Sequence, residues 1–402
     1  MKSLQRIAAS TSVALSLASV AFGQNYTQTN LVSNVSGVAP VTDPQLVNSW
    51  GLTRTSSSVW WVSDNATGVS TLYNGVGQKQ SLVVTIPPAD PTNKLTPNGS
   101  PTGVVANGSA TEFKIAPGDP AVFIFSTIDG TIAAWNPKVN LAKGQAAPST
   151  HAITVAKGAT GSVYTGLTSG FINGKRFLYA ANFGRGRVDV YDTAFFPVTL
   201  HRSGSDGDRH DEYRNPSDNE PFVDDQLPPD FVPFNVQAIG DDIVVTYVLH
   251  LQGSPVETDG PGLGYVDIYS SSGKLLNRLE HGDWLNAPWG VALAPLDFGR
   301  FSHHLLVGQF AGGGTTQSSG LIAAYDLATG RFDGVLQDAG GKPLSIQGIW
   351  ALSPANLSPA TVDPDQEPAS EIYFTAAPNH GTGGLFGYLN AVSDELTEGS
   401  VQ

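Results

Sequence analysis

The feature that most constrains this chain is a unit of roughly sixty residues that recurs six times. Each copy has a first strand near a glycine, a second apolar strand that ends in a polar or small residue, and a third strand that glycine opens and an aromatic residue closes. The expected first strands are 48–52, 101–105, 164–168, 233–238, 287–292 and 346–351. The expected second strands are 59–65, 121–126, 177–182, 243–247, 304–309 and 372–377. The expected third strands are 68–74, 130–136, 186–192, 264–270, 320–326 and 384–390.

Short strands separated by Gly, Pro, Asn and Asp, with no amphipathic helix, indicate an all-β fold. Repeats of this length in such a pattern predict a six-bladed β-propeller with four-stranded blades, because radial repetition leaves only short sheet edges. Fourth strands follow some copies, as at 273–279 and 330–336. The last copy has no fourth strand of its own, so we expect 26–33 to close the ring by joining the last blade. A β-sandwich pair and a β-helix are the alternatives.

Composition excludes several classes of protein. The chain has 402 residues with 21 basic and 35 acidic side chains, which give a net charge of −14, so it lacks the clustered Lys and Arg that nucleic-acid binding requires. The absence of Cys excludes disulfide frameworks, zinc ribbons and cysteine nucleophiles. The chain carries 7 Trp, 12 Tyr and 18 Phe, enough to build a large core.

The first residues have the pattern of a secretory signal. Lys2 and Arg6 precede an apolar stretch, and Ala21-Phe-Gly23 fits the small-x-small cleavage pattern. We therefore expect a signal peptide at 1–23, one propeller domain at 24–393 and a flexible tail at 394–402, in a secreted, extracellular monomer with no membrane span. A membrane anchor is the alternative reading of the leader, but the stretch is short for one. Glycosylation sequons begin at Asn25, Asn34, Asn65, Asn98, Asn107 and Asn356.

Several segments of the mature chain together resemble an uncharacterised family of secreted six-bladed propellers. They include Asn48-Ser-Trp-Gly, Trp61-Val-Ser-Asp-Asn, Pro233-Phe-Asn-Val-Gln-Ala and Leu285-Asn-Ala-Pro-Trp-Gly-Val. Others are Leu31-Val-Ser, Gly262-Leu-Gly-Tyr-Val-Asp, Phe298-Gly-Arg-Phe-Ser and Tyr373-Phe-Thr-Ala. The family is related in fold to NHL-repeat and gluconolactonase-like propellers. The resemblance implies the fold and secretion, and it implies no reaction.

Polar residues at the strand ends are candidates for a ring at the propeller mouth, where loops from all blades converge. The candidates are Asn48, Asp64, Asn65, Asp129, Asn182, His250, Asn379 and His380. Asn and Asp oxygens suit Ca²⁺ or another divalent ion, and the related gluconolactonase-like propellers use such a site to polarise a carbonyl or activate water. The recurrence of Asp or Asn after a strand also fits a purely structural turn role.

An acidic stretch at about 201–230 departs from the repeat and indicates an inserted loop between the third and fourth copies. Its carboxylates at Asp206, Asp208, Asp211 and Glu212 form a weak calcium-binding pattern, without the glycine and the distal Glu of an EF-hand loop. Three arginines in the same stretch would offset this charge, so a solvated loop is the alternative. Part of the acidic excess lies in this segment.

Motifs for several enzyme classes are absent from the sequence. It contains no Gly-x-Ser-x-Gly nucleophile elbow and no His-Glu-x-x-His, and its glycine clusters lie between expected strands rather than before helices. The leading hypothesis is therefore a secreted module that binds an extracellular small molecule, carbohydrate or protein at the mouth. Exposed indoles among Trp50, Trp284, Trp289 and Trp350 would supply a sugar platform. The alternatives are a divalent-metal-assisted lactonase or lyase with an axial Asn/Asp site, and a scaffold.

Overall fold

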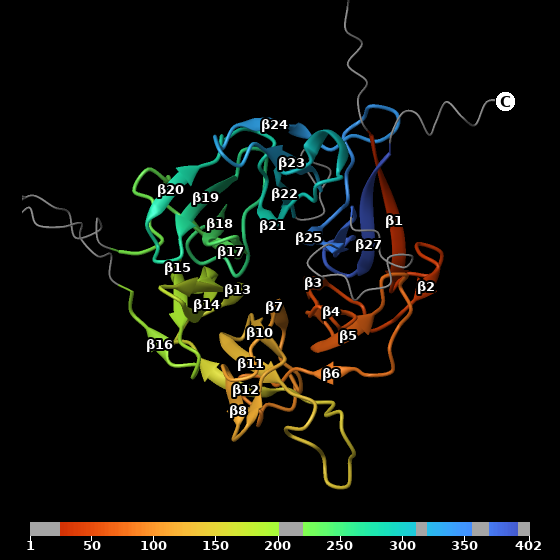
Figure 1. The fold of residues 1–402 in the computed structure, drawn as a ribbon, viewed down its shortest axis with the longest axis vertical. Helices are drawn as coiled ribbons and strands as arrows, with labels where there is room; N and C mark the ends of the chain where they lie inside the picture. The colour runs from red at the N-terminus through yellow and green to blue at the C-terminus, as the bar shows by residue number, and fades with distance from the viewer. Residues whose placement is uncertain (1–24, 201–219, 311–319, 356–369, 393–402) are drawn as a thin grey trace, which may run out of the picture.

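The computed structural model describes residues 25–200, 220–310, 320–355 and 370–392. These ranges contain the short 3₁₀ turns η1 (Phe183–Arg185) and η3 (Gly299–Phe301), and no helix within them is long and apolar enough to cross a membrane. Six sheets surround a central axis (Figure 1). The prediction of an all-β, six-bladed propeller is confirmed.

The blades run from an inner strand at the axis to an outer strand at the rim. The inner strands are β3 (Ser49–Thr53), β7 (Pro101–Ala106), β13 (Tyr164–Ile172), β17 (Phe231–Ile239), β21 (Pro288–Leu293) and β25 (Ile349–Pro354). The second strands are β4 (Trp60–Asp64), β10 (Phe123–Thr127), β14 (Lys175–Asn182), β18 (Asp242–Leu249), β22 (Leu305–Gln309) and β26 (Ile372–Ala376). The third strands are β5 (Val69–Tyr73), β11 (Thr131–Trp135), β15 (Arg187–Tyr191), β19 (Gly264–Ser270), β23 (Ile322–Tyr325) and β27 (Leu385–Val392).

Outer strands complete the blades. In the first five blades they are β6 (Val84–Thr85), β12 (Ile153–Lys157), β16 (Pro197–Val198), β20 (Leu275–Arg278) and β24 (Phe332–Val335). In the sixth blade, β1 (Asn25–Ser33) pairs antiparallel with β27, and β2 (Val41–Thr42) adds a fifth strand parallel to β1. A small hairpin of β8 (Lys114–Ala116) and β9 (Asp119–Pro120) lies between β7 and β10.

The repeated glycines permit the inner strands to approach one another closely. A Cβ added to Gly51 would lie 2.4 Å from the carbonyl oxygen of Thr102, and one added to Gly103 would lie 2.4 Å from the backbone nitrogen of Leu167. Real Cβ atoms do not approach backbone this closely, so a larger residue would push the blades apart. Asn235 and Ala351 occupy the corresponding positions of the fourth and sixth blades.

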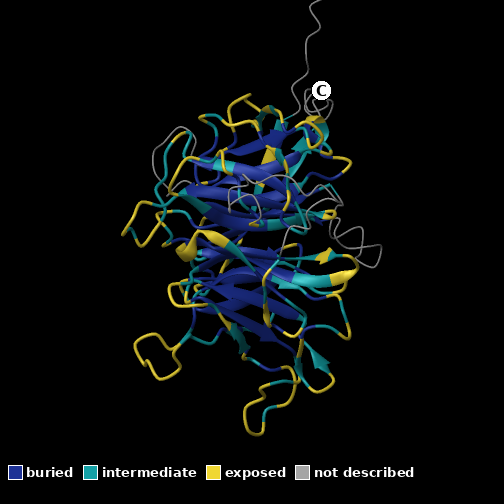
Figure 2. Ribbon diagram, turned by 90° about the vertical axis from the view of Figure 1, so that its left-hand side faces the viewer, coloured by how far each residue is buried: buried dark blue, intermediate teal, exposed yellow. Residues whose placement is uncertain are grey.

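The aromatic residues that end the third strands are buried between neighbouring blades. Tyr73, Trp135, Tyr191, Tyr269 and Tyr325 are all buried. The last four belong to clusters that combine residues of two adjacent sheets, and the ring centroid of Tyr73 lies 5.5 Å from that of Phe386 in the sixth blade. Figure 2 shows the same division, with buried strands inside and exposed residues on the turns. The low content of charged residues, 14%, thus follows from sheets that are covered on both faces.

The end of the expected insert is part of the packed structure, whereas 201–219 lie outside the described residues. The ring of Phe222 is buried against Tyr179 and Tyr269, with centroid distances of 5.7 and 5.5 Å. The carboxylate of Asp224 accepts two hydrogen bonds of 2.6 Å from Arg278 on β20. Residues 220–230 therefore connect the third and fourth blades rather than extend into solvent.

Candidate functional site

The mouth of the propeller is the end at which the inner strands begin and the second strands finish. Four aromatic side chains meet there on the axis, and we call them the axial plug: Trp50, Phe234, Trp289 and Trp350. The rings of Trp50 and Trp350 stack with centroids 3.5 Å apart, and Trp289 meets them edge-on at 6.1 and 5.5 Å. Phe234 completes the group, 5.8 Å from Trp350. All four side chains are buried, so they form a solid floor beneath the mouth loops.

The polar atoms of the axial plug have partners in the protein. Asn48 Oδ1 accepts hydrogen bonds from Trp50 Nε1 at 3.0 Å and from Trp350 Nε1 at 3.3 Å. The third indole, Trp289, donates to the carbonyl oxygen of Thr165 at 3.0 Å. Asn48 can reach both indoles because its backbone adopts a left-handed conformation with φ of 51°, which Asn tolerates better than most residues. No indole N–H of the plug is left for a ligand.

The exposed indoles that a sugar platform would require are not found at three of the four tryptophans. Trp50, Trp289 and Trp350 are buried because they fill the axis. Trp284 is half-buried, stacks on Phe332 with centroids 3.8 Å apart, and donates a hydrogen bond to the hydroxyl of Tyr325. The sequence places the indoles in matching positions, but it does not say how closely they meet across the axis.

A small space lies on the axis beside the plug. A cavity of about 20 Å³, enough for one water molecule, is lined by residues of several inner strands. They are Gly51, Leu52, Gly103, Val104, Leu167, Asn235, Gln237, Trp289, Val291, Ala351 and Leu352. Most of this lining is apolar, and the Asn235 amide already donates to the Trp289 carbonyl oxygen at 2.7 Å.

Asp64 and Asn65, two members of the expected polar ring, are buried at the end of β4. Oδ2 of Asp64 accepts hydrogen bonds from the backbone N–H and the hydroxyl of Thr71, at 3.0 and 2.7 Å. Burial raises the pKa of the Asp64 carboxyl well above its usual range. Asn65 joins the plug from the side, because its Oδ1 accepts from Asn48 Nδ2 at 3.1 Å and its Nδ2 donates to the carbonyl oxygen of Pro101.

The remaining members of the expected ring lie at separate turns. Asn182 is buried and donates to Asp189 Oδ2 at 2.7 Å, whereas Asp129 is exposed and accepts from the backbone of Ser100 at 3.1 Å. Asn379 and His380 are exposed on consecutive left-handed residues. The structure thus brings together Asn48 and Asn65, and it gives Asp64, Asp129 and Asn182 local partners. A role for these residues in ligand binding stays a prediction.

Metal-binding groups were a second expectation. Within the described ranges, no three His, Asp or Glu side chains gather closely enough to hold a metal ion. The acidic pattern of Asp206, Asp208, Asp211 and Glu212 lies outside those ranges.

One mouth loop, residues 250–263 between β18 and β19, rises from the fourth blade beside the plug. The ring of His250 packs on Phe183 at 4.1 Å between centroids, and Phe183 in turn lies 6.1 Å from Phe234 of the plug. Leu251 and Val256 are 49% and 56% exposed. The corresponding connection in the first blade spans only 65–68, so loop 250–263 is long for this fold.

Loop 250–263 is tied down at several points. His250 Nε2 lies 2.9 Å from the carbonyl oxygen of Ser254, and the N–H of Thr258 donates to the carbonyl oxygen of Leu249 at 2.8 Å. The N–H of Gly260 donates to Asn286 Oδ1 at 2.7 Å, which joins the loop to the fifth blade. Sequence reasoning selected His250 but missed the loop, although the long polar interval between the second and third strands of this copy was the signal.

The carboxyl of Glu257 gives loop 250–263 a charged group near the histidine. Burial raises the pKa of Glu257, and nearby Asp259 raises it further, whereas His250 lowers it. A half-buried carboxyl with a raised pKa in a mouth loop is the kind of group that marks functional sites in enzymes and binding proteins.

The sequon asparagines have different environments. Asn65 and Asn107 are buried, and Nδ2 of Asn107 donates to the carbonyl oxygens of Ser109, Glu112 and Ala121. Nδ2 of Asn34 and of Asn98 also donates to backbone carbonyls. Because a glycosylated amide nitrogen keeps a single N–H, a glycan on Asn107 would have to displace some of its three bonds. Asn25 is half-buried at the start of β1, and Asn356 lies outside the described residues.

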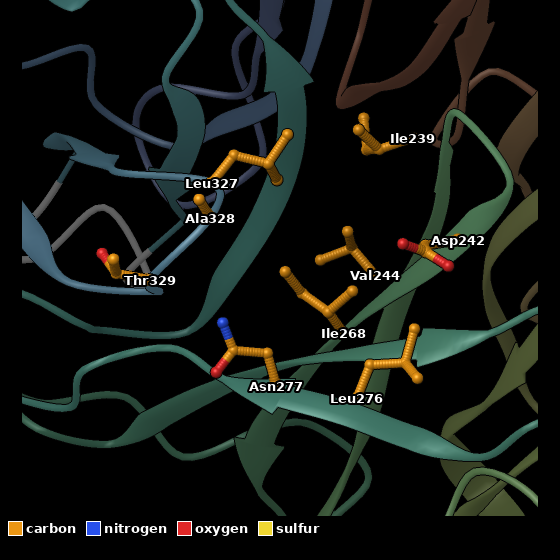
Figure 3. Close-up of a pocket in the computed structure, with 9 residues that line it drawn as sticks. All are labelled: Ile239, Asp242, Val244, Ile268, Leu276, Asn277, Leu327, Ala328 and Thr329. Carbon is orange, nitrogen blue, oxygen red and sulfur yellow. The ribbon is translucent and has the colours of Figure 1, made fainter.

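A larger cavity lies away from the axis, between the fourth and fifth blades. Its volume is about 430 Å³, and Figure 3 shows the side chains that surround it. They are Ile239, Asp242, Val244, Ile268, Leu276, Asn277, Leu327, Ala328 and Thr329. We call it the interblade pocket. Sequence reasoning missed it, because its walls come from strands of one repeat and a turn of the next, whose spacing no motif records.

The fold and these sites define a six-bladed β-propeller with a filled axis. No protein-family model matches the chain. It is similar to three uncharacterized proteins of Acanthamoeba polyphaga mimivirus. Protein L690 is 29% identical over 379 residues, which cover 91% of this chain and 85% of the relative. Protein R648 is 26% identical, with coverage of 89% and 78%. Protein R640 is 29% identical over 287 residues, 70% of this chain, and the match spans about half of the relative, 46%.

Among solved structures, the chain is similar to a streptogramin B lyase, with a TM-score of 0.44 and 10% identity over 92% of this chain and 98% of the other. It is also similar to hydrazine synthase of Kuenenia stuttgartiensis, with a TM-score of 0.42 and 13% identity over 85% of this chain and 80% of the other. At these values neither similarity bears on what this chain does.

Proposed function

We propose that the protein is a binding propeller that engages an extracellular protein or peptide at its mouth, with loop 250–263 as the principal contact. The observation that carries this proposal is the exposure of Leu251 and Val256 on a loop that is anchored beside the axial plug. An anchored loop loses little conformational freedom on binding, so more of the contact energy remains as affinity.

The charge of the loop indicates the chemistry of the partner. Glu257 and Asp259 lie next to the exposed apolar side chains, and the whole chain carries a net charge of −14. A peptide with apolar residues flanked by Lys or Arg would match this surface, and the charges would also raise its rate of association.

A library of random displayed peptides, selected on the mature protein, tests the proposal. We expect enrichment of peptides that combine basic and apolar residues. These peptides should lose most of their binding to the double variant Leu251→Asp/Val256→Asp. The control is Leu296→Asp, because Leu296 is exposed in the turn between β21 and β22 at the opposite end of the propeller. Equal binding to both variants, or no enrichment, would contradict the proposal, and a signal confined to a glycan array would indicate a carbohydrate instead.

A divalent-metal-assisted lactonase or lyase is a second candidate, which the electrostatic interaction of the Glu257 carboxyl with His250 on the same loop favours. Such a pair could move a proton during the opening of an ester or lactone ring. A panel of lactones assayed with and without added Ca²⁺ tests it. Turnover that requires the ion and is lost in His250→Ala would support this candidate, and no turnover on any lactone would exclude the reaction class tested.

Secretion is part of the proposed function. The supporting observation is the signal-like sequence before Gln24. Expression of the full chain in a secreting host, followed by mass measurement of the released protein, should give an N-terminus at Gln24. Retention of the unprocessed chain inside the cell would contradict it.

A further inference from the structure

The interblade pocket lies at the end of the fourth blade that faces away from the mouth. Ile239 and Asp242 flank the turn between β17 and β18, and Leu276 and Asn277 come from β20. The opposite wall is the turn between β23 and β24 of the fifth blade, which carries Leu327, Ala328 and Thr329. The pocket is therefore independent of loop 250–263 and of the proposed function.

The inner part of the pocket is apolar. Val244 and Ile268 are buried on the face of the fourth sheet that packs against the fifth blade. Leu276 and Leu327 are 49% and 36% exposed, and Figure 3 shows them on opposite sides of the opening. A volume of about 430 Å³ falls in the lower part of the range typical of small-molecule sites.

Two polar side chains in the pocket lack partners among the described residues. Neither the carboxylate of Asp242 nor the amide of Asn277 makes a side-chain hydrogen bond or an ion pair within those ranges, although both residues are half-buried. The hydroxyl of Thr329, in contrast, already donates to Asp326 at 2.7 Å. No Lys, Arg or His lines the pocket.

These features together determine the ligand chemistry. An ionised carboxylate only accepts hydrogen bonds, and a half-buried one is stabilised by a cation. We propose that the interblade pocket binds a small organic amine, with its ammonium group on Asp242 and its apolar body on Val244, Ile268 and Leu327, so that the body extends toward Asn277 on the other side of the pocket. The pKa of Asp242 supports this assignment, since burial and neighbouring Asp241 raise it and a bound cation would counter both effects.

Calorimetric titration of the mature protein at pH 8 with three matched ligands tests the proposal. The ligands are 2-phenylethylamine, 2-phenylethanol and 3-phenylpropionate, which share an apolar body and differ in charge. We expect the amine to bind at least tenfold more tightly than the alcohol, and the carboxylate to show no binding. Equal affinity of amine and alcohol, or no binding of the amine, would overturn the proposal.

Three variants locate the binding. Asp242→Asn should abolish the tenfold preference for the amine, because it removes the charge and keeps the shape. Asp241→Asn is the matched control, since Asp241 is exposed, adjacent and outside the lining, and it should keep the preference. Ala328→Trp should block all binding by filling the pocket. If that variant does not fold, Leu327→Lys serves the same purpose by placing a cation in the pocket. An equal loss in Asp241→Asn and Asp242→Asn, or full binding to the blocked variants, would show that the amine binds elsewhere.

Discussion

The axis and the gap between the fourth and fifth blades are built from the same repeat, yet they are filled very differently. At the axis, three indoles and a phenyl ring leave a cavity of about 20 Å³. Between the fourth and fifth blades, the interblade pocket has a volume of about 430 Å³. Trp precedes the repeated glycine in the first and fifth copies and precedes Ala351 at the same position of the sixth, whereas the outer turn of the fifth blade has Ala328 and Thr329.

This difference shows that the position of a free space in a propeller depends on a few side-chain volumes and not on the fold alone. A convergent channel is the usual expectation for a ligand site in a ring of blades. Here that channel is part of the core, and the surface that remains for ligands lies on the mouth loops and between blades. Substitutions in the two regions can test how much the axial plug contributes to stability and whether the interblade pocket is open in solution.

The largest effect is expected from emptying the axis. Trp350→Ala removes a side chain that is 1% exposed and contacts the rings of Trp50, Trp289 and Phe310. We expect the free energy of unfolding to fall by about 3–5 kcal/mol, measured by urea denaturation. Leu296→Ala, at an exposed position, is the control and should change it by less than about 0.5 kcal/mol. A small loss in Trp350→Ala would mean that the plug does not contribute to stability.

The second effect concerns the fourth sheet. One face of this sheet borders the interblade pocket, and the opposite face, which carries Asp267, packs against the third blade. Burial, followed by the neighbouring carboxylate of Asp224, raises the pKa of Asp267 to about 7. The folded state therefore binds this proton more tightly than the unfolded state, and stability is lost as pH rises from about 4 through about 7. Asp267→Asn mimics the protonated form, so its loss of stability between pH 5 and pH 8 should be smaller by on the order of 1–3 kcal/mol.

Urea denaturation at the two pH values checks this prediction. Asp225→Asn is the control, because Asp225 is exposed in the same segment that carries Asp224. It should keep the pH dependence of the unaltered protein. If Asp267→Asn keeps that dependence too, the carboxyl of Asp267 is ionised in the folded protein at neutral pH.

A third, smaller effect is expected at Asn48, which accepts the indole hydrogen bonds of the axial plug. Asn48→Gly keeps the left-handed backbone but leaves the N–H groups of Trp50 and Trp350 without their acceptor. We expect a loss of about 1–2 kcal/mol, and a further loss of about 1 kcal/mol in Asn48→Ala, which adds backbone strain. Thermal unfolding compares the two variants. Stability equal to that of the unaltered protein in Asn48→Gly would show that these bonds are replaced by water.

The smallest effect is expected at the interblade pocket. Leu276→Ala shortens a side chain at the edge of the interblade pocket that is already 49% exposed. Since little packing is lost, we expect a change below about 0.5 kcal/mol in urea denaturation. A loss of 2 kcal/mol or more would show that the pocket is closed in solution, and the comparison with the axis would then fail.

The fold could be predicted from the sequence because its determinants are local and repeated. Glycines such as Gly51 and Gly103 recur where inner strands touch, and Tyr73 and its counterparts recur where blades meet. The site could be predicted only in part. Asn48 was selected as a mouth residue, but its second indole partner, Trp350, is 302 positions away along the chain. The interblade pocket joins strands of one repeat to a turn of the next, and no local pattern encodes the distance between them.

The pairing of β1 with β27 has a mechanical consequence. Asn25 is opposite Val392 at one end of this antiparallel pair, and Ser33 is opposite Leu385 at the other. A force that pulls residues 25 and 392 apart therefore loads the hydrogen bonds one after another, as in the opening of a zipper, and never all at once. Extensive burial stabilises the ring against thermal unfolding. A small force applied to these two residues would nevertheless separate β1 from β27 one hydrogen bond at a time.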